Sequence, residues 1–408
     1  MWHGSGSRNK RLERLNATRG ARGDFVLVMF MAVAYTSSMR CEDRKADPGD
    51  GDESVGSERR RGRGSLSNRT GRFEAQERTE TDDGWESMAG MAAFRTRVLD
   101  EKARTIITRN DSPDISFNQS INPYRGCEHG CIYCYARPTH CYLGHSAGLD
   151  FETRLYAKPD AAGLLRRELA RPGYVAKTIA LGTNTDPYQP IERDRRITRA
   201  VLEVLAETGH PAGIVTKSAL VVRDVDILGP MAAKGLVKVA ISVTTLDRHL
   251  ARRMEPRAST PTRRLEAVRQ LAEAGIPTAV MVAPVVPGLT DHEIEAILAA
   301  AAAAGAQEAG YIALRLPLEI KTLFREWLAA ERPDRAARVM ALMQSMHEGR
   351  DYRAEFGLRQ KGSGPYAEQI GHRFRLAARR LGLNARKLAL RTDLFRPPVL
   401  EGGQMRLL

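Results

Sequence analysis

The sequence predicts an α/β protein built as a partial (β/α)6 barrel, and two patterns along the chain lead to this fold class. From about residue 96, short runs of β-branched and apolar residues alternate about six times with helix-length segments. Such alternation is typical of parallel strands joined by helical crossovers. The strand runs are apolar throughout, as expected when both faces of a parallel sheet are buried. A doubly wound open sheet is the alternative arrangement.

The individual elements follow from the same patterns. The predicted strands are 115–121, 178–181, 213–216, 237–243, 278–283 and 311–314. The predicted helices between them are 195–208, 221–234, 261–274 and 291–304. A glycine stands at or just after the end of each helix, where a residue with positive φ commonly ends a helix: Gly209, Gly235, Gly275 and Gly305. This recurrence supports the strand–helix assignment.

Composition divides the chain into three parts. Residues 1–95 are rich in Gly, Ser, Arg, Asp and Glu and lack apolar periodicity, so we expect a disordered, basic N-terminal extension. Residues 96–331 form the predicted barrel. After residue 331 the strand patterns stop, and two helical segments, 335–347 and 365–381, predict a basic, mainly helical C-terminal extension over 332–408.

The N-terminal extension contains an apolar run, residues 25–35, behind a basic start. This order resembles a signal peptide, although no A-x-A cleavage site follows it. The run is too short to span a bilayer, which needs about 20 residues. The alternative is that residues 1–38 are translated upstream sequence and that initiation occurs at Met39 or later.

A second segment of the extension, residues 59–72, carries six arginines and no acidic residue. Such a run is a solvated flexible linker or a basic arm that binds phosphates or a partner surface.

The formal charge of the 408-residue chain is +14, but it is unevenly distributed. Residues 1–80 carry +4, residues 81–331 carry +1 and residues 332–408 carry +9. The last helical segment contributes Arg373, Arg375, Arg379 and Arg380. The excess indicates a polyanionic partner that binds beside the barrel, such as a nucleic acid.

The chain has five cysteines, too few for a disulfide scaffold, and three of them stand close together. Cys127, Cys131 and Cys134 have the spacing C-x3-C-x2-C, which can direct three thiolates at one point. Three thiolates can hold three irons of a [4Fe–4S] cluster and leave the fourth iron open to a cofactor or substrate.

Two other kinds of metal site are compatible with the same three cysteines. Zinc could bind the three thiolates together with Cys141, His129, His140 or His145, although a second C-x2-C pair is missing. An electron-carrying cluster would take Cys141 as its fourth ligand.

The cysteine spacing resembles the radical S-adenosylmethionine superfamily, in which an aromatic residue precedes the third cysteine, as Tyr133 does here. The strings NPYRGCEHGCIYCYARPTH and GTNTDPYQPIE are similar to the branch that contains spore photoproduct lyase, over about residues 60–400. The resemblance implies a barrel of the radical SAM type, a [4Fe–4S] cluster on the three cysteines, and S-adenosylmethionine on the fourth iron. One extra cysteine of the lyase has no counterpart, because no cysteine follows Cys141.

The resemblance also implies where the cofactor binds, at the carboxyl ends of the strands. Besides Tyr133, the candidate cofactor-binding residues are Thr183, Asn184 and Asp186 after the second strand, Lys217 after the third, Ser242 and Thr244 at the fourth, and Arg315 after the sixth. In the family, such residues bind the ammonium, carboxylate and ribose of the cofactor. Residues 282–284 would pack on its adenine.

The implied reaction is reductive cleavage of S-adenosylmethionine to a 5′-deoxyadenosyl radical, which abstracts a hydrogen atom from the substrate. It requires a flavodoxin- or ferredoxin-like electron donor. Thiolates that bind a cluster need a reducing compartment, so we expect a cytoplasmic protein without a membrane segment. A nucleic acid could be the substrate, bound through the basic extension. The alternatives are a peptide or small-molecule substrate, or a non-catalytic iron–sulfur redox or binding protein.

Overall fold

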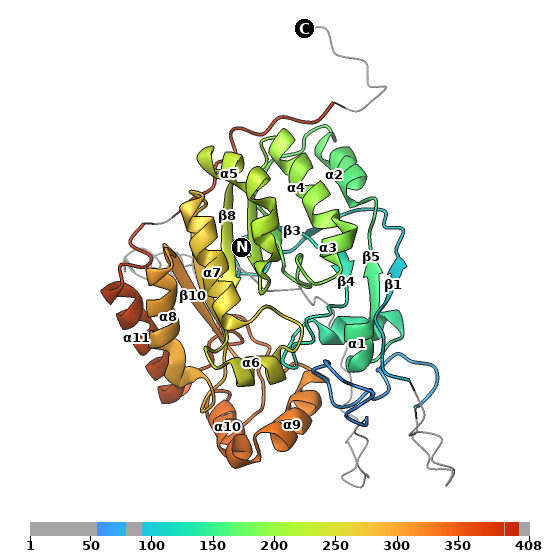
Figure 1. Ribbon diagram of the computed structural model, residues 1–408, viewed down its shortest axis with the longest axis vertical. Coiled ribbons are helices and arrows are strands. Elements are labelled where there is room, and N and C mark those ends of the chain that lie inside the picture. Colours follow the sequence, from blue (N-terminus) through green and yellow to red (C-terminus); the bar gives the residue numbers. More distant parts are fainter. Residues whose placement is uncertain (1–54, 79–91, 387, 400–408) are drawn as a thin grey trace, which may run out of the picture.

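The computed structural model describes residues 55–78, 92–386 and 388–399 and contains one large curved sheet (Figure 1). Its seven strands lie in the order β10-β9-β8-β7-β6-β3-β2. They are β2 (Ile107–Arg109), β3 (Gln119–Ile121), β6 (Ile179–Leu181), β7 (Ala212–Thr216), β8 (Val237–Ser242), β9 (Thr278–Val285) and β10 (Glu308–Ala313). The strands from β3 to β10 are parallel, and β2 adds an antiparallel edge.

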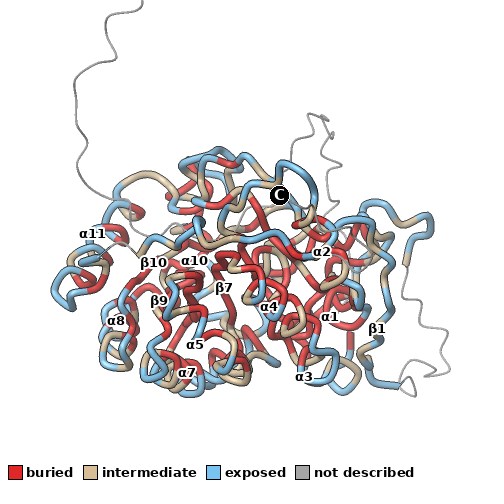
Figure 2. Tube along the Cα trace, turned by 90° about the horizontal axis from the view of Figure 1, so that it is seen from above, coloured by how far each residue is buried: buried red, intermediate tan, exposed pale blue. Residues whose placement is uncertain are grey.

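This order confirms the predicted partial barrel. The six parallel strands neighbour one another in chain order, without the reversal that defines a doubly wound sheet. The helices between them are α4 (Ile197–Glu207), α5 (Val225–Ala233), α7 (Pro261–Glu273) and α8 (Ile294–Ala303). They lie along the outside of the sheet (Figures 1 and 2). Gly209, Gly235, Gly275 and Gly305 all have positive φ just after these helices, as predicted.

The two faces of the sheet carry side chains of different size. Branched residues such as Ile179, Ile214 and Ile241 pack against the outer helices in the main core. Smaller residues such as Ala180 and Ala240 lie in a separate cluster on the other face. Since neighbouring side chains of a strand point to opposite faces, this alternation separates a helix-packed outer face from an inner face with room for a ligand.

A smaller sheet lies beside the large one, and its strands stand on both sides of the cysteine loop in the sequence. Its strands are β1 (Arg97–Asp100), β4 (Tyr124–Arg125) and β5 (Arg154–Ala157), in the order β1-β5-β4. The chain leaves β4 directly into the cysteine loop, then passes through η1 (Arg137–Leu143) and α1 (Leu149–Thr153) before it returns as β5.

The remaining helices are α2 (Ala161–Leu169), α3 (Glu192–Arg195), η2 (Ala219–Asp224), α6 (Arg248–Met254), η3 (Asp291–Glu293), α9 (Ile320–Glu331), α10 (Pro333–Ser345) and α11 (Gly364–Arg380). α10 and α11 match the two helical segments expected in the C-terminal extension. α9 was not predicted, although Ile320, Leu323, Phe324 and Trp327 form a buried stripe on it.

Residues 381–386 and 388–399, which follow α11, contain no helix. This segment runs across the amino ends of the strands and hydrogen-bonds to the chain there. Asn384 N donates to Gln307 O (2.9 Å), Arg391 N to Gly235 O (2.9 Å) and Arg396 N to Thr208 O (2.8 Å). The segment therefore covers the end of the sheet opposite to the carboxyl ends of the strands (Figure 1).

Residues 55–78 are also ordered by contacts with the barrel, so they are not the solvated linker considered from composition. Arg63 is 7% exposed, and Ser65 and Ser67 are fully buried. Ser67 Oγ donates to Glu326 in α9 (2.7 Å). The apolar run 25–35 and the start-site alternatives at residues 1–39 lie outside the described residues.

Among the residues that the structure describes, no helix has the length and apolar character needed to cross a bilayer.

Candidate active site

The three cysteines of the C-x3-C-x2-C motif lie in one loop at the carboxyl end of the sheet. Cys127, Cys131 and Cys134 line a single pocket of about 770 Å³, a volume that includes the part open to solvent. The pocket is also lined by residues at or just after the carboxyl ends of β6, β7, β8, β9 and β10. Gly126 and Gly130 have positive φ (73° and 66°), which lets the loop turn back on itself.

Burial controls the protonation of these thiols. Cys127 and Cys131 are 6% and 7% exposed, and burial raises the pKa of all three thiols above the ordinary value. Neighbouring acids, Asp186 for Cys127 and Glu255 for Cys131, raise the pKa values further. A thiol in such surroundings is neutral unless a positively charged partner stabilises its thiolate, and bound iron is such a partner.

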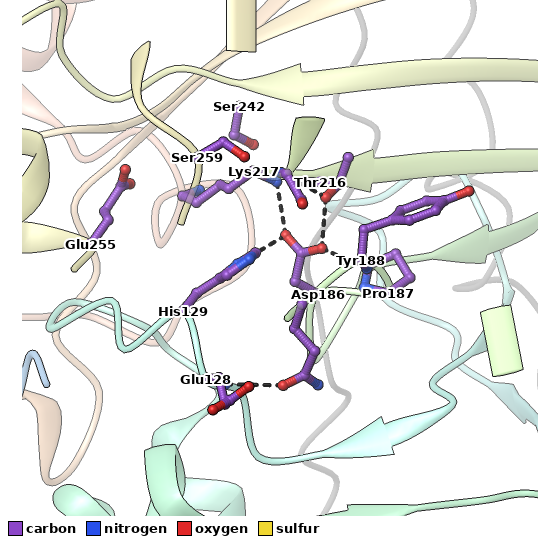
Figure 3. A network of polar contacts seen from close by, with 12 residues as sticks. Glu128, His129, Asp186, Pro187, Tyr188, Thr216, Lys217, Ser242, Glu255 and Ser259 are labelled. Atoms are coloured by element: carbon purple, nitrogen blue, oxygen red, sulfur yellow. Dashed lines mark hydrogen bonds and ion pairs between the residues drawn. The ribbon is translucent and has the colours of Figure 1, made fainter. Parts of the chain in front are cut away.

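Asp186 holds the end of β7 against the cysteine loop (Figure 3). One of its carboxylate oxygens accepts from Thr216 Oγ1 (2.6 Å) and Tyr188 N (2.9 Å). The other accepts from Lys217 N (2.8 Å) and lies 3.3 Å from His129 Nδ1. Although burial alone would raise it, the pKa of Asp186 is lowered to about 2 by His129 and these hydrogen bonds. Both carboxylate oxygens of Asp186 are thus already bound by neighbouring groups of the protein.

Gln189 supports the same loop from the other side. Its Oε1 accepts from Glu128 N (2.9 Å), and its Nε2 donates to Gly126 O (3.1 Å). The side chain is fully buried. Together with Asp186, it fixes the backbone around Cys127 through the segment that follows β6.

A second buried network holds the aromatic residue of the motif. The hydroxyl of Tyr133 donates to the carboxylate of Glu255, which also accepts from Thr244 Oγ1 (2.7 Å). Arg264 forms an ion pair with Glu255, and both side chains are 1% exposed. Burial alone would raise the pKa of Glu255, but Arg264 and Lys217 lower it to about 2. Tyr133 is therefore held by a charged pair behind the pocket.

The structure brings most of the candidate cofactor residues to the pocket, with two exceptions. Tyr133, Asn184, Asp186, Lys217, Ser242 and Arg315 line it. Thr183 does not, and its hydroxyl points to Asn122 Oδ1 (3.4 Å). Thr244 also lies outside the lining, because its side chain belongs to the Glu255 network.

Two features of the lining are suited to a charged ligand. Asn184 Oδ1 is buried without a hydrogen-bond partner, which leaves an acceptor for a ligand N–H group. Lys217 Nζ lies at the wall, where it donates to Ala283 O (3.2 Å) and stands 5.7 Å from the centre of the Tyr133 ring. An acceptor and a cation in one pocket fit a ligand that carries both an ammonium and a carboxylate.

Some residues of the site had no assigned role in the sequence reasoning. His129 and Tyr135 line the pocket, and Arg315 lies over the Tyr135 ring at 5.2 Å. His129 was considered only as a zinc ligand. Glu255 and Arg264 carried no sequence signal, because their pairing depends on how α6 and α7 pack. Tyr135 directly follows Cys134, and this proximity is the signal that could have drawn attention to it.

Cys141 lies apart from the site. It is fully buried in η1, outside the pocket lining, and burial raises the pKa of its thiol to about 11. Within residues 55–78, 92–386 and 388–399, no three His, Cys, Asp or Glu side chains are arranged to hold a single metal ion.

Comparison with known proteins places this pocket in a family. The family model of the radical SAM superfamily matches residues 121–301, which include the three cysteines and the strands from β4 to β9. A curated relative, uncharacterized protein Rv2578c of Mycobacterium tuberculosis, is 40% identical over 230 residues, which are 56% of this chain and 68% of the relative. The chain belongs to the radical SAM superfamily. This membership confirms the resemblance drawn from the cysteine motif and makes the chain a radical SAM enzyme.

Further relatives of this radical SAM enzyme are more distant. The protein called Radical SAM Nalpha-GlyT isomerase, of Pseudomonas phage M6, is 26% identical over 180 residues, which are 43% of this chain and 35% of that protein. Spore photoproduct lyase, solved in complex with a dinucleoside spore photoproduct, superimposes with a TM-score of 0.51 at 17% identity, over 70% of this chain and 80% of the lyase. The chain therefore shares the fold of the lyase.

Proposed function

We propose that Cys127, Cys131 and Cys134 hold a [4Fe–4S] cluster and that S-adenosylmethionine occupies the pocket beside it. When bound, the two groups supply a 5′-deoxyadenosyl radical through reductive cleavage of the cofactor. The observation that carries the proposal is the convergence of three cysteines, an unpartnered amide oxygen and a lysine on one pocket. The donor set also fits the cluster, since thiolates are its usual ligands.

The residues of the lining divide the binding of the cofactor between them. Asn184 Oδ1 would accept from its ammonium group, and Lys217 would pair with its carboxylate. Ser242 lies at the end of β8, where its hydroxyl is available to the ribose. Pro284 and Ile312 supply an apolar wall for the adenine. Asp186 acts indirectly, because it positions Lys217 and His129 and has its own acceptors filled.

The enclosing side chains also protect a reactive intermediate. Tyr133 and Tyr135 flank Cys134 and narrow the pocket on the cluster side. Val215, Ala283 and Ile312 close the inner face of the sheet without polar groups. Exclusion of competing reactions, alongside binding and orientation, is one of the contributions that a protein makes to cofactor chemistry. We also propose a cytoplasmic location, because the thiolates must remain reduced.

We further propose that the substrate is a nucleic acid or nucleotide. A groove lined by Arg332, Arg335, Arg338 and Tyr366 lies against the loops that follow β8 and β9, at the same end of the sheet as the pocket. Arg379 and Arg380 are exposed at the end of α11, and Arg373 is paired with Glu295 (2.6 Å). The groove is also lined by Asp247, Asp291 and Glu293, and Arg332 and Arg335 each pair with Asp334 at 3.3 Å. The groove arginines lie at the carboxyl end of the sheet, whereas α11 ends near Asn384, which bonds to Gln307 at the amino end of β10. By this position we favour the groove over α11 for holding phosphates near the site. The lyase structure with a bound dinucleoside supports the same substrate class.

Anaerobic reconstitution followed by an assay for 5′-deoxyadenosine tests the chemistry. The reconstituted, reduced protein should produce deoxyadenosine, and Cys→Ala variants at 127, 131 or 134 should contain little iron and produce none. Cys141→Ala is the matched control and should behave like the wild type. A protein that binds the cluster but never cleaves S-adenosylmethionine would be a non-catalytic redox or binding protein.

Oligonucleotide binding tests the substrate class. Affinity should fall steeply with salt, and each phosphate contact removed should reduce the slope of log K against log salt by about 0.9. Arg335→Gln with Arg338→Gln should reduce this slope, whereas Arg379→Gln with Arg380→Gln should leave it nearly unchanged. Binding that is absent or insensitive to salt would favour a peptide or small-molecule substrate.

A further inference from the structure

Residues 55–65, which we call the N-terminal cover, lie directly over the outer side of the cysteine loop. A Cβ atom on Gly64 would come 1.8 Å from the carbonyl oxygen of Gly130, so the two backbones are in contact. Gly130 does not line the pocket, whereas its neighbour Cys131 does. The cysteine loop is therefore sandwiched between the pocket on one side and the cover on the other. In Figure 1 the cover is the blue segment near α1.

A buried carboxylate fastens the cover to the loop. Glu152 is fully buried and accepts from Gly64 N and Ser65 N, both at 2.9 Å. It also pairs with Arg137 (2.6 Å), which donates to Gly130 O (3.1 Å) and Cys131 O (2.9 Å). One ion pair thus joins the backbone of the cover to the backbone of the cysteine loop.

The arginines of the cover are held in place by the same contacts. Arg63 points inward and donates to Glu152 O and Phe94 O, both at 3.0 Å. Phe94 N donates to Arg59 O (2.9 Å), and the Arg59 guanidinium lies 5.2 Å from the centre of the Phe94 ring. The segment 92–96 is therefore part of the same surface as the cover.

The outer side of this surface is positively charged. Arg59 and Arg60 are half-buried, and Arg61 and Arg95 are exposed. Glu58 is the single acidic residue between positions 55 and 65. In the part of the chain that the structure describes, no ion pair joins any of these four arginines to a carboxylate. We call Arg59, Arg60, Arg61 and Arg95 the basic face.

We propose that the basic face is the docking surface for an acidic protein that delivers one electron to the cluster. The proposal rests on the proposed function, since only a redox cluster on the three cysteines needs such a partner. A substrate has to enter the pocket, whereas an electron donor needs only a short path to the cysteine loop, and the cover lies on that path. A positive surface attracts an acidic partner and accelerates its association.

One electron would pass from the flavin of the donor to the cluster. A flavodoxin hydroquinone loses one electron and becomes the semiquinone, and the cluster passes from the 2+ to the 1+ state. The flavin releases any proton to solvent, so neither a bond to this chain nor a further reactant is required.

The test compares two ways of reducing the reconstituted full-length protein. Reduced flavodoxin serves as the acidic probe and dithionite as the small-molecule reductant. Electron paramagnetic resonance follows cluster reduction, and a titration measures flavodoxin binding as a function of salt.

Arg61→Glu with Arg95→Glu should slow reduction by flavodoxin about tenfold or more at low salt and weaken binding to a similar degree. Reduction by dithionite should be unchanged. Arg379→Glu with Arg380→Glu carries the same charge change at a distant helix and should have no effect.

Three results would overturn the proposal. The double variant at 61 and 95 could accept electrons from flavodoxin as fast as the wild type, or the α11 variant could be impaired equally. Oligonucleotides that displace flavodoxin from the basic face, and themselves depend on Arg61 and Arg95, would show a nucleic-acid surface instead. If dithionite leaves the wild-type cluster oxidised, the proposed function itself fails and the docking proposal falls with it.

Discussion

Glu255 and Arg264 form a buried ion pair directly behind Tyr133, with each of the two side chains only 1% exposed. The pair joins α6 to α7, and the Tyr133 hydroxyl donates to its carboxylate. Such a pair in the interior is expensive to break, because removal of one partner leaves an uncompensated charge away from water. This relationship leads to the first prediction.

Arg264→Met should destabilise the protein by about 3–5 kcal/mol, because Glu255 is left buried without its partner. Urea unfolding of the purified variant measures the change. Arg264→Met combined with Glu255→Leu should recover part of the loss, since the double variant buries no charge. An equal loss of unfolding free energy in the single and double variants would mean that the two side chains stabilise the protein through packing and not through their charges.

Gly64→Ala should destabilise the protein by about 1–3 kcal/mol, because the new Cβ would lie 1.8 Å from Gly130 O and one backbone must move. Any shift of Gly130 would displace the neighbouring Cys131, so the reconstituted variant should also bind less iron. Gly56→Ala is the matched control in the same segment, where no atom lies within 4 Å of an added Cβ. Identical thermal stability and iron content in the two variants would contradict the close contact.

Asn184→Ala and Lys217→Ala should each weaken the binding of S-adenosylmethionine about tenfold or more, through loss of a hydrogen bond or ion pair to a charged group. Isothermal titration calorimetry on the reconstituted protein measures the affinity. Thr183→Val tests the position of the pocket wall, because the Thr183 hydroxyl points away from it to Asn122. Its affinity should match the wild type, and a loss equal to that of Asn184→Ala would place Thr183 in the site.

His210 should make stability fall as the pH drops from about 6.5 to 4. The side chain is fully buried, and burial lowers its pKa from 6.5 to about 4. The unfolded chain takes up the proton near pH 6.5, but the folded chain takes it up only near pH 4. The contribution of His210 to the free energy of unfolding is therefore fully present above pH 6.5. It is lost as the pH falls from 6.5 to 4, and its size is on the order of 3 kcal/mol.

Urea midpoints at several pH values measure the effect. His210→Gln should flatten the curve between pH 6.5 and 4, while the similarly lowered pKa of His140 keeps some slope. His249→Gln, at an exposed position, should retain the wild-type curve. An unchanged slope in His210→Gln would show that His210 takes up its proton at the same pH in the folded and unfolded chain.

The strands were predictable because a strand that is buried on both faces appears in the sequence as a continuous run of apolar residues. The runs at 237–243 and 278–283 match β8 and β9 closely. α9 was missed even though Ile320, Leu323 and Trp327 have helical spacing. Its pattern begins after the last predicted strand, where no further crossover was required.

The site was predictable where spacing alone carries the chemistry. The three cysteines are close in sequence, so their spacing fixes their common pocket. The side-chain directions of Thr183 and Thr244 depend on contacts with Asn122 and Glu255, which the sequence does not pair with them. The positioning role of Asp186 could not be predicted either, because its partners come from the cysteine loop and from β7, which are distant in the sequence.

The cover shows the limit of composition as a guide. A run of arginines predicts exposure, because guanidinium groups are seldom buried. Arg63 is buried nevertheless, since Glu152 and Phe94 supply acceptors that lie far along the chain.

The C-terminal segment has a consequence for the order in which the molecule is assembled. Residues 384–396 complete hydrogen bonds at Thr208, Gly235 and Gln307, at the amino ends of three different strands. They stand more than 240 residues after the cysteine loop in the chain, so the cysteine loop leaves the ribosome well before them. The sheet is thus still open at one end while the thiols already exist, so the nascent chain offers iron-loading machinery a less tightly closed protein than the finished one.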